Sequence, residues 1–390
     1  MRLDISYFAQ TNHRNRRVPF GIKLPDRLLH TYIVGQTGVG KSTLLETLAW
    51  QDFQAGRGFS LVDPHGDLVS QLAERMRAAA PERIVYLNAC DPWLPYGYNP
   101  LRRVRADKIP LAVSGLLETL KKLWPDAWGV RMEHVLRNSL YALLERDGST
   151  LPDILRLFSD DDYRKAIVGG IRNDVVQRFW KDEFEAYPPR LRAEACAPIQ
   201  NKLGALLANP TLRRILVAPD IDLHFRKLMD DGTILLVNVS KGRLGAECSL
   251  LLGSLVVSTL GLAAFSRAES DERPPYFLYL DEFHNFTTLM LANMMSELRK
   301  YGLGLVLAHQ FLQQLEPEIR HAVLGNAGTI LAFRVGPEDA ALLADAFQPQ
   351  FGVLDLLSLP NRSIYLKLMI DGAPSAPFSA TILAPDALPG

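Results

Sequence analysis

The sequence has little cysteine and no excess of charge of either sign. Its three cysteines, Cys90, Cys196 and Cys248, lie far apart and show no Cys/His spacing that could hold zinc, so neither a zinc module nor a disulfide framework is expected. Lys plus Arg equals Asp plus Glu at 43 each, so no overall charge attracts the chain to nucleic acid or to anionic membranes. Any contact with a polyanion must therefore be local.

The sequence also lacks a recognisable secretory signal, because no basic segment precedes an apolar core in the opening residues MRLDISYFAQ. One uncharged stretch, 249–265, approaches the roughly 20 apolar residues that span a bilayer. It contains several glycine and hydroxyl residues and lacks a clustered basic flank and an aromatic belt. A buried helix is therefore predicted there, with a membrane span as the alternative.

Short apolar runs alternate with helix-length segments along much of the chain. With 390 residues, 48% of them hydrophobic, the chain is long enough for two units or for one domain with a large insertion. Strands that alternate with helices predict an α/β fold with a mostly parallel sheet covered on both faces. The predicted strands are 31–34, 59–62, 83–88, 234–239, 276–280, 303–307 and 329–335, and the helices include 41–54, 67–79 and 289–301.

Two segments depart from this alternation. Near the end, 363–370 and 378–383 predict two further strands joined by a turn that begins at Asp371-Gly372, at one edge of the sheet. The stretch 106–217 has no β-rich runs and shows helical spacing instead, so we predict an all-α insertion. The predicted domains are an α/β domain of residues 1–105 and 218–390 and an all-α domain of residues 106–217.

The clearest motif is GQTGVGKS at residues 35–42, which matches GxxxxGK[ST] between a predicted strand and a predicted helix. A glycine-rich loop at a helix N-terminus offers converging N–H donors to phosphates without Cβ clashes. Lys41 is expected between the β- and γ-phosphates, and Ser42 is the expected Mg²⁺ ligand. The motif predicts ATP and Mg²⁺ as cofactors, with the binding residues Gly35, Gln36, Thr37, Gly38, Val39, Gly40, Lys41, Ser42 and Thr43.

A second motif supplies acidic residues. The apolar run 276–280 ends in Asp281 and Glu282, which is typical of a buried strand whose tip delivers a carboxylate to Mg²⁺. Asp281 is the predicted metal ligand, and Glu282 is placed to polarise the attacking water. The alternative is an exposed acidic turn. Adjacent Asp and Glu favour hydrolysis over phosphoryl transfer to a small acceptor.

Two more strand ends carry polar residues. Asp63-Pro64-His65-Gly66 resembles the DxxG of GTPases, but the guanine-specifying NKxD is not found, since the nearest candidate, 201–204, lacks the carboxylate. Asp63 is a candidate to hold a water on Mg²⁺ or to orient the nucleophile, with a structural turn as the alternative. Gln310 follows the predicted strand 303–307 and is a candidate to sense the γ-phosphate through its amide, with ordinary loop polarity as the alternative.

The segments GQTGVGKS, LVDPHGDL, FLYLDEFHNF, ELRKYGLGLVLAHQ and GTILAFRVGPEDA, in that order, resemble the HerA/FtsK superfamily of hexameric DNA-pumping ATPases. The TraG-like conjugative coupling branch looks most similar. The resemblance covers nearly the whole chain, including the helical insertion, which is similar to the all-α domain of coupling proteins. It implies a RecA-like core in a six-membered ring, with ATP between subunits and double-stranded DNA in the central channel.

The resemblance also implies roles for single residues. Lys41 and Ser42 match the Walker A pair, Asp281 and Glu282 match Walker B, and Gln310 matches the polar sensor. Two arginines are candidates for a cation that one subunit donates to the nucleotide of its neighbour. Such an arginine typically raises the rate of hydrolysis by ~10³ or more. Arg299 matches the position of a trans-acting arginine finger, Arg334 is a second candidate, and a surface salt bridge is the alternative for each.

The leading hypothesis is a ring-forming ATPase that binds double-stranded DNA without sequence preference and translocates it. The alternatives are a secretion ATPase that moves a protein and a nucleotide-regulated ring scaffold for a partner nuclease or other effector. Coupling proteins usually carry N-terminal transmembrane helices, which this sequence does not show. We therefore expect a cytoplasmic protein with no transmembrane segment of its own, either soluble or peripheral to the inner membrane through a partner.

Overall fold

A computed structural model describes residues 4–14 and 16–387 of the chain. The chain divides into two compact units. The sheet unit comprises Met1–Asn88, Phe225–Ser240 and Ala263–Gly390, and the helical unit comprises Ala89–His224 and Lys241–Leu262. The predicted insertion, 106–217, falls within the helical unit, which extends further on both sides. Residues 1–3 and 388–390, which the predicted α/β domain includes, lie outside the described residues.

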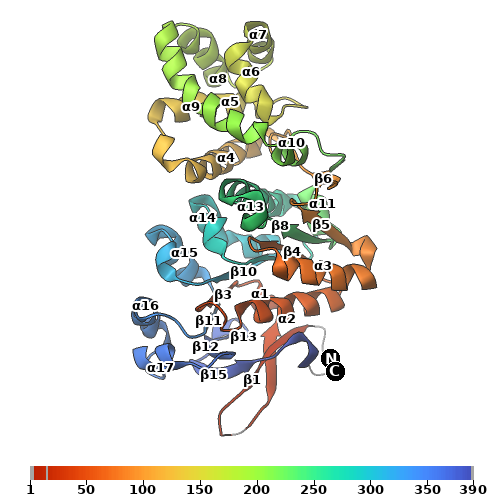
Figure 1. Cartoon of the computed structure of the whole chain (residues 1–390), viewed down its shortest axis with the longest axis vertical. Coiled ribbons are helices and arrows are strands. Elements are labelled where there is room, and N and C mark those ends of the chain that lie inside the picture. The colour runs from red at the N-terminus through yellow and green to blue at the C-terminus, as the bar shows by residue number, and fades with distance from the viewer. Residues whose placement is uncertain (1–3, 15, 388–390) are drawn as a thin grey trace. The chain divides into compact units, whose positions relative to one another are not determined.

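Among the described residues, eleven strands form one sheet in the order β2-β1-β15-β12-β11-β3-β10-β9-β4-β8-β5 (Figure 1). The seven strands from β11 to β5 pair in parallel, and the pairs from β2 to β11 are antiparallel. The predicted α/β fold with a mostly parallel sheet is confirmed. The strands are β1 (Ile5–Thr11), β2 (Pro19–Lys23), β3 (Thr31–Val34), β4 (Gly58–Asp63), β5 (Ile84–Asn88), β8 (Ile234–Asn238), β9 (Tyr276–Leu280), β10 (Leu303–His309), β11 (Thr329–Ala332), β12 (Ser363–Lys367) and β15 (Phe378–Ile382).

One edge of the sheet differs from the prediction. β1 and β2 lie outside the predicted set and cover β15, so the predicted C-terminal strands lie inside the sheet instead of at its edge. β1 pairs with β15, for example Ala9 with Ile382. Because the pairing strands lie at opposite ends of the sequence, no local sequence pattern predicts this edge. The turn at Asp371 and Gly372 is confirmed, with φ of 51° and 78°, but it joins the short strands β13 (Met369–Ile370) and β14 (Ala373–Pro374) instead of β12 and β15.

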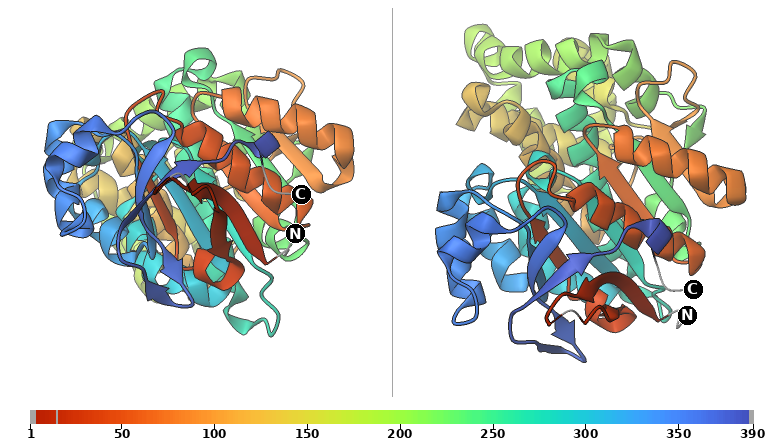
Figure 2. Two further views of the ribbon diagram at one scale, coloured as in Figure 1. Left: turned by 90° about the horizontal axis from the view of Figure 1, so that it is seen from below. Right: turned by 60° about the horizontal axis from the view of Figure 1, so that its bottom comes forward.

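Apolar side chains place helices on the sheet. Figure 2 shows α2 and α3, in orange, over the same face of the sheet. Leu45 and Leu48 of α2 and Leu72 of α3 are buried in one cluster with Phe59 and Phe277 from the strands. The helices of this unit are α1 (Leu24–Arg27), α2 (Lys41–Gln54), α3 (Asp67–Ala79), α11 (Phe225–Asp230), α14 (Leu289–Leu298), α15 (Pro317–Asn326), α16 (Pro337–Phe347) and α17 (Val353–Ser358).

The helical unit is built around buried leucines. Residues 106–217, all of which the structure describes, contain helices and turns and no strand. The short strands β6 (Tyr96–Gly97) and β7 (Ile221–Asp222) pair outside this range. The helices are α4 (Ile109–Leu123), α5 (Val130–Leu144), α6 (Leu151–Ser159), α7 (Asp161–Gly169), α8 (Asp174–Arg178), α9 (Pro189–Ala208), α10 (Pro210–Leu216), α12 (Lys241–Leu244) and α13 (Ala246–Phe265), the last crossing into the sheet unit at Ala263.

Helix α13 carries the uncharged stretch that the sequence analysis considered as a membrane span. In the described part of the chain, the segment Ala246–Glu269 is the one helix long and apolar enough to cross a bilayer. Of its most apolar window, 72% is buried within the fold, as in the core helix of a soluble protein. The predicted buried helix is confirmed.

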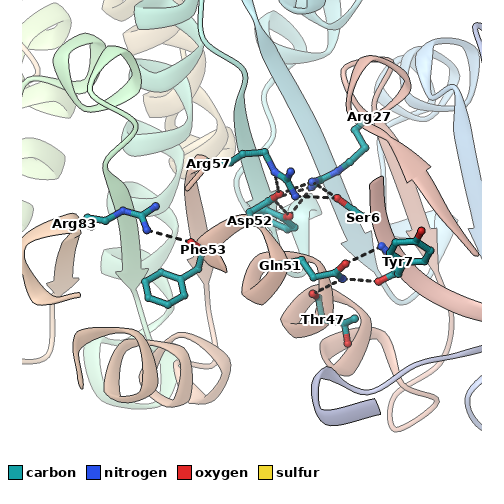
Figure 3. Close-up of polar contacts among 10 residues, drawn as sticks. Ser6, Tyr7, Arg27, Thr47, Gln51, Asp52, Phe53, Arg57 and Arg83 are labelled. Atoms are coloured by element: carbon teal, nitrogen blue, oxygen red, sulfur yellow. Dashed lines mark hydrogen bonds and ion pairs between the residues drawn. The ribbon is translucent and has the colours of Figure 1, made fainter. Parts of the chain in front are cut away.

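A buried ion pair ties the start of β3 to the end of α2. Figure 3 shows Arg27, which precedes β3, against Asp52 near the end of α2, with Arg57 on the same carboxylate. Arg27 and Asp52 are 1% and 0% exposed, and Arg27 Nη2 donates to Asp52 Oδ2 at 2.9 Å. Burial alone would lower the pKa of Arg27 and raise that of Asp52, but their opposite charges outweigh it and keep both groups ionised.

Asp52→Ala should lower the free energy of unfolding by about 3–5 kcal/mol, because it leaves the buried Arg27 charge without its partner. Urea unfolding at pH 7 measures the loss. Since Arg27 holds the pKa of Asp52 below its ordinary value, the contribution is full above about pH 4 and disappears only as the pH falls further. The control is Asp386→Ala, which removes an exposed partner of Arg75 and should hardly move the urea midpoint. Equal effects of the two substitutions would contradict the assignment.

Candidate active site

The loop from Gly35 to Gly40 connects β3 to α2 at the carboxyl end of the parallel strands. Gly38 and Gly40 have φ of 78° and 121°, a region that side-chain-bearing residues rarely adopt. At Gly35, a Cβ atom would lie 2.5 Å from the Cβ of Phe333, so only glycine lets the loop approach β11. The loop is therefore wrapped tightly around the N-terminus of α2, where backbone N–H groups favour anions.

Lys41 is the first residue of α2, and its side chain turns back over this loop. Its Nζ donates to the carbonyl oxygens of Gly35 at 2.6 Å and Gln36 at 3.0 Å, and the residue is 7% exposed. Burial lowers the pKa of Lys41, while the carboxylates of Glu282 and Asp281 act in the opposite direction. The lysine of the first motif therefore lies within electrostatic reach of the acidic pair of the second.

Asp281 and Glu282 follow β9 directly and are each 5% exposed. Burial, together with the neighbouring carboxylates of Asp63 and Glu282, raises the pKa of Asp281 to about 6, although Lys41 and His65 act in the opposite direction. Glu282 has φ of 47°, a left-handed conformation unusual for glutamate. Strained backbone and a perturbed acid at one place are typical of functional sites.

Gln310 joins the two motifs. Its Nε2 donates to Glu282 Oε1 at 2.7 Å, and its Oε1 accepts from Thr37 Oγ1 at 2.9 Å. One amide thus bonds the glycine-rich loop and the acid at the same time. The bonds depend on adjacent strand ends, because β10 lies between β3 and β9 in the sheet.

The Asp63 carboxylate is fully buried and already holds the backbone at the start of α3. It accepts from the N–H groups of His65 at 2.8 Å, Leu68 at 3.0 Å and Val69 at 3.3 Å. These bonds fit the structural turn that the sequence analysis gave as the alternative. The charge of Asp63 still acts on Asp281, so both carboxylates belong to one site.

The two candidate arginines occupy different places. Arg334 Nε donates to Gln36 Oε1 at 3.2 Å, so this arginine contacts the glycine-rich loop of its own chain. Arg299 lies in the turn before β10 starts, whereas the loop lies where the strands end. It is exposed and forms no ion pair with any described residue. The structure thus brings Lys41, Asp63, Asp281, Glu282, Gln310 and Arg334 together and leaves Arg299 apart.

Hard oxygen donors suit Mg²⁺ at this site. Ser42 is exposed in the first turn of α2, and Asp281 is a buried carboxylate whose proton a nearby cation would displace. Within residues 4–14 and 16–387, no three His, Cys, Asp or Glu side chains are grouped to hold a metal. The hydroxyl of Ser42 and the carboxylate of Asp281 are oxygen donors of the kind that Mg²⁺ takes alongside phosphate and water, so these residues fit the ion.

Some neighbours of the site lie outside the predicted set. His284 Nδ1 lies 3.5 Å from Glu282 Oε2. Its position two residues after the acid pair could have marked it in the sequence as a neighbour of the site. His309 is buried and pairs with the Tyr32 hydroxyl, and burial lowers the pKa of His309 to about 3. Arg362 packs beside Gly40, and nothing in its sequence context marks it.

These positions define a class: the chain is a P-loop NTPase with a RecA-like core. Residues 17–348 match the family described as the type IV secretion-system coupling protein DNA-binding domain. That match spans most of the 390 residues, so the chain belongs to this family, and the resemblance to the coupling branch of the HerA/FtsK superfamily is confirmed. A search of curated proteins gives no significant match.

Solved structures share the fold at low sequence identity. The unbound bacterial conjugative coupling protein TrwB has a TM-score of 0.66 at 16% identity, covering 96% of this chain and 89% of that one. TrwB in complex with ADP and Mg²⁺ has a TM-score of 0.67 at 17% identity, covering 95% and 91%. VirB4 of Thermoanaerobacter pseudethanolicus has a TM-score of 0.63 at 14% identity, covering 97% and 96%. These likenesses confirm the RecA-like fold.

Asp281→Asn should remove a pH-dependent part of the stability. With its pKa raised from 3.8 to about 6, Asp281 binds its proton more tightly when the chain is folded. This contribution is full below about pH 4 and is lost as the pH rises through about 6, a change of about 3 kcal/mol. In urea unfolding with EDTA and no nucleotide, the variant should therefore gain about 3 kcal/mol relative to the parent between pH 4 and 8. Asp386→Asn, at an exposed site, should give a constant difference, and a constant difference for Asp281→Asn would refute the coupling.

Proposed function

We propose that the chain is an ATP-dependent, ring-forming motor that binds double-stranded DNA and translocates it. The observation that carries the ATPase proposal is the bonded path from Thr37 through Gln310 to Glu282, because it ties the phosphate loop to the predicted water-activating acid. The proposal for DNA rests on the family to which the chain belongs, a coupling protein DNA-binding domain.

The nucleotide would be bound by the amides of residues 35–40 and by Lys41, with its γ-phosphate toward Gln310. Mg²⁺, when bound, supplies positive charge that neutralises the phosphate oxygens, and Ser42 and Asp281 would hold it. Glu282 is placed to orient the attacking water and accept its proton, since one of its oxygens, Oε1, is fixed by Gln310 while Oε2 has no hydrogen-bond partner among the described residues.

Gln310 would couple the two halves of this reaction. A γ-phosphate near Thr37 offers the Gln310 amide a new partner, so the amide can leave Glu282 or reorient it. Asp63 would act indirectly, by fixing the start of α3 and by adding charge beside Asp281. Hydrolysis would in this way depend on a loaded phosphate loop.

Arg299 is our preferred trans-acting arginine. It lies in the turn before β10, at the amino ends of the parallel strands, whereas the phosphate loop lies at their carboxyl ends. Its own loop is therefore out of reach, and its target would be the γ-phosphate bound by a neighbouring subunit. Arg334 contacts the Gln36 side chain of its own loop and would act within the subunit. An arginine donated across an interface makes hydrolysis depend on assembly, which supports a closed ring and, by the superfamily resemblance, a hexamer.

We place this motor in the cytoplasm, where ATP is available and where the three free cysteines of the described chain stay reduced. Attachment to the inner membrane through a partner protein would bring it to a secretion channel. A protein substrate, or a scaffold role beside a nuclease, remains an outcome of the test below, because no described feature favours either.

ATP turnover should rise several-fold when double-stranded DNA of any sequence is added, and the stimulation should fall steeply with salt, because phosphate contacts release counterions. Steady-state phosphate release between 50 and 200 mM salt measures both effects. ATP turnover that does not change when DNA is added would refute the DNA proposal and favour a protein substrate.

Lys41→Ala should abolish ATP turnover by weakening nucleotide binding. Glu282→Gln should retain ATP and lose at least about a hundredfold in rate. The matched control is Glu272→Gln, at an exposed acid of the same unit, which should turn over at the parental rate.

Mixing variants separates the two arginines. Arg299→Ala and Arg334→Ala should each be inactive alone, and each is mixed with an equal amount of Lys41→Ala chain. Activity should return only with Arg299→Ala, because a Lys41→Ala subunit can still donate Arg299 to an intact neighbouring site. Phosphate release and particle mass with nucleotide are measured together. Rescue of Arg334→Ala without rescue of Arg299→Ala would reverse the assignment.

A further inference from the structure

The phosphate loop has two flanks in the sheet. On one side of β3 lie β10 and β9, which carry Gln310 and the acid pair. On the other side lie β11, β12 and β15. The hydrolysed end of a nucleotide belongs beside Gln310 and Glu282, so the rest of the molecule must extend over the second flank. Residues exposed there are candidates to contact the nucleoside.

The turn before β12 is held against this loop. Arg362 N donates to Val39 O at 2.8 Å. Arg334 Nη1 and Nη2 donate to Leu359 O at 3.1 Å and Asn361 Oδ1 at 3.0 Å, and its Nε reaches Gln36. These bonds tie the turn to Val39 directly and to Gln36 through Arg334. Arg362 therefore has a defined position relative to the phosphate loop.

Arg362 adopts a backbone conformation that arginine disfavours. Its φ is 65°, a left-handed conformation that is strained for a residue other than glycine. Asparagine and glycine would be accommodated there with less strain. The packing of the turn alone therefore does not call for arginine at this position.

The side chain of Arg362 starts beside the loop and ends in solvent. A Cβ atom at Gly40 would lie 3.6 Å from Arg362 Cγ, 3.4 Å from Phe333 Cε1 and 3.0 Å from Ile382 Cδ1. Arg362 is exposed, and its guanidinium forms no hydrogen bond or ion pair with any described residue. The Arg362 side chain thus begins at the side of the phosphate loop, where the buried Ile382 also packs beside Gly40.

We propose that Arg362 contacts the nucleoside part of the bound nucleotide, its guanidinium lying against the face of the base. The inference rests on the proposed nucleotide site. The phosphates are already served by the loop amides and Lys41, whereas a planar cation beside an apolar side chain suits a flat heteroaromatic ring. Arg362 then contributes to affinity for nucleotides and not to affinity for phosphate alone.

The test compares ADP with inorganic pyrophosphate, each with Mg²⁺, by titration calorimetry on the full chain. Arg362→Asn keeps the left-handed backbone and should weaken ADP binding roughly five- to thirtyfold while leaving pyrophosphate binding unchanged. Arg362→Lys keeps the charge without the plane and should recover only part of the loss. Arg17→Ala, at an exposed arginine of the N-terminal hairpin, is the control and should match the parent for both ligands.

Equal losses for ADP and pyrophosphate, restored by Arg362→Lys, would make Arg362 a phosphate contact and overturn the proposal. Parental ADP affinity in Arg362→Asn would overturn it as well. A parent chain that binds neither ligand would instead refute the nucleotide site, so the two failures are distinguishable. Urea midpoints show whether Arg362→Asn is folded, and if it is not, Arg362→Gly, which relieves the positive φ, replaces it in the same comparison.

Discussion

The register of three neighbouring parallel strands is the constraint on which the rest of the site depends. β10 lies between β3 and β9, with His309 beside Val34 and Leu307 beside Leu280. The residues that follow these strands therefore emerge at one edge, although they are separated by some 240 positions in the sequence. Without this register Gln310 could not bond Thr37 and Glu282 together.

The site places several carboxylates in positions where they are buried from solvent. Asp63 and Glu282 lie close enough for their charges to act on Asp281, and Lys41 is a cation that faces the acid pair. This arrangement costs stability in the free chain, and it is the environment in which a metal–phosphate complex is favoured. Elsewhere in the unit, Arg27 and Asp52 form a buried pair that fixes the helix behind the phosphate loop. The helix that follows the phosphate loop is thus fixed by a neutralised ion pair, whereas the loop itself faces an excess of negative charge.

Two residues with unusual backbone conformations lie beside the phosphate loop. Glu282 and Arg362 both have positive φ, and they lie on opposite flanks of the phosphate loop. Glu282 is the acid proposed to orient the attacking water, and Arg362 carries the guanidinium proposed to contact the nucleoside. Arg334 joins the second flank to Gln36, and Gln310 joins the first flank to Thr37. In the proposed reaction, these few loop residues would link nucleotide binding to hydrolysis.

The sequence by itself determined the parallel strands, the phosphate loop, the acid pair and Gln310, because each is a local pattern with a chemical meaning at fixed spacing. It also determined the helical character of residues 106–217, through periodicity alone. The tertiary structure decided what depends on distant partners. β1 and β2 join the sheet through pairing with β15, Asp63 is occupied by backbone amides, Arg334 bonds its own loop, and Arg362 reaches Gly40. The contacts of β1, Arg334 and Arg362 leave no local signature, since each is made with residues that only folding brings near. Asp63 bonds amides that follow it closely in the sequence, and the structure decided between the two roles that the sequence left open for it.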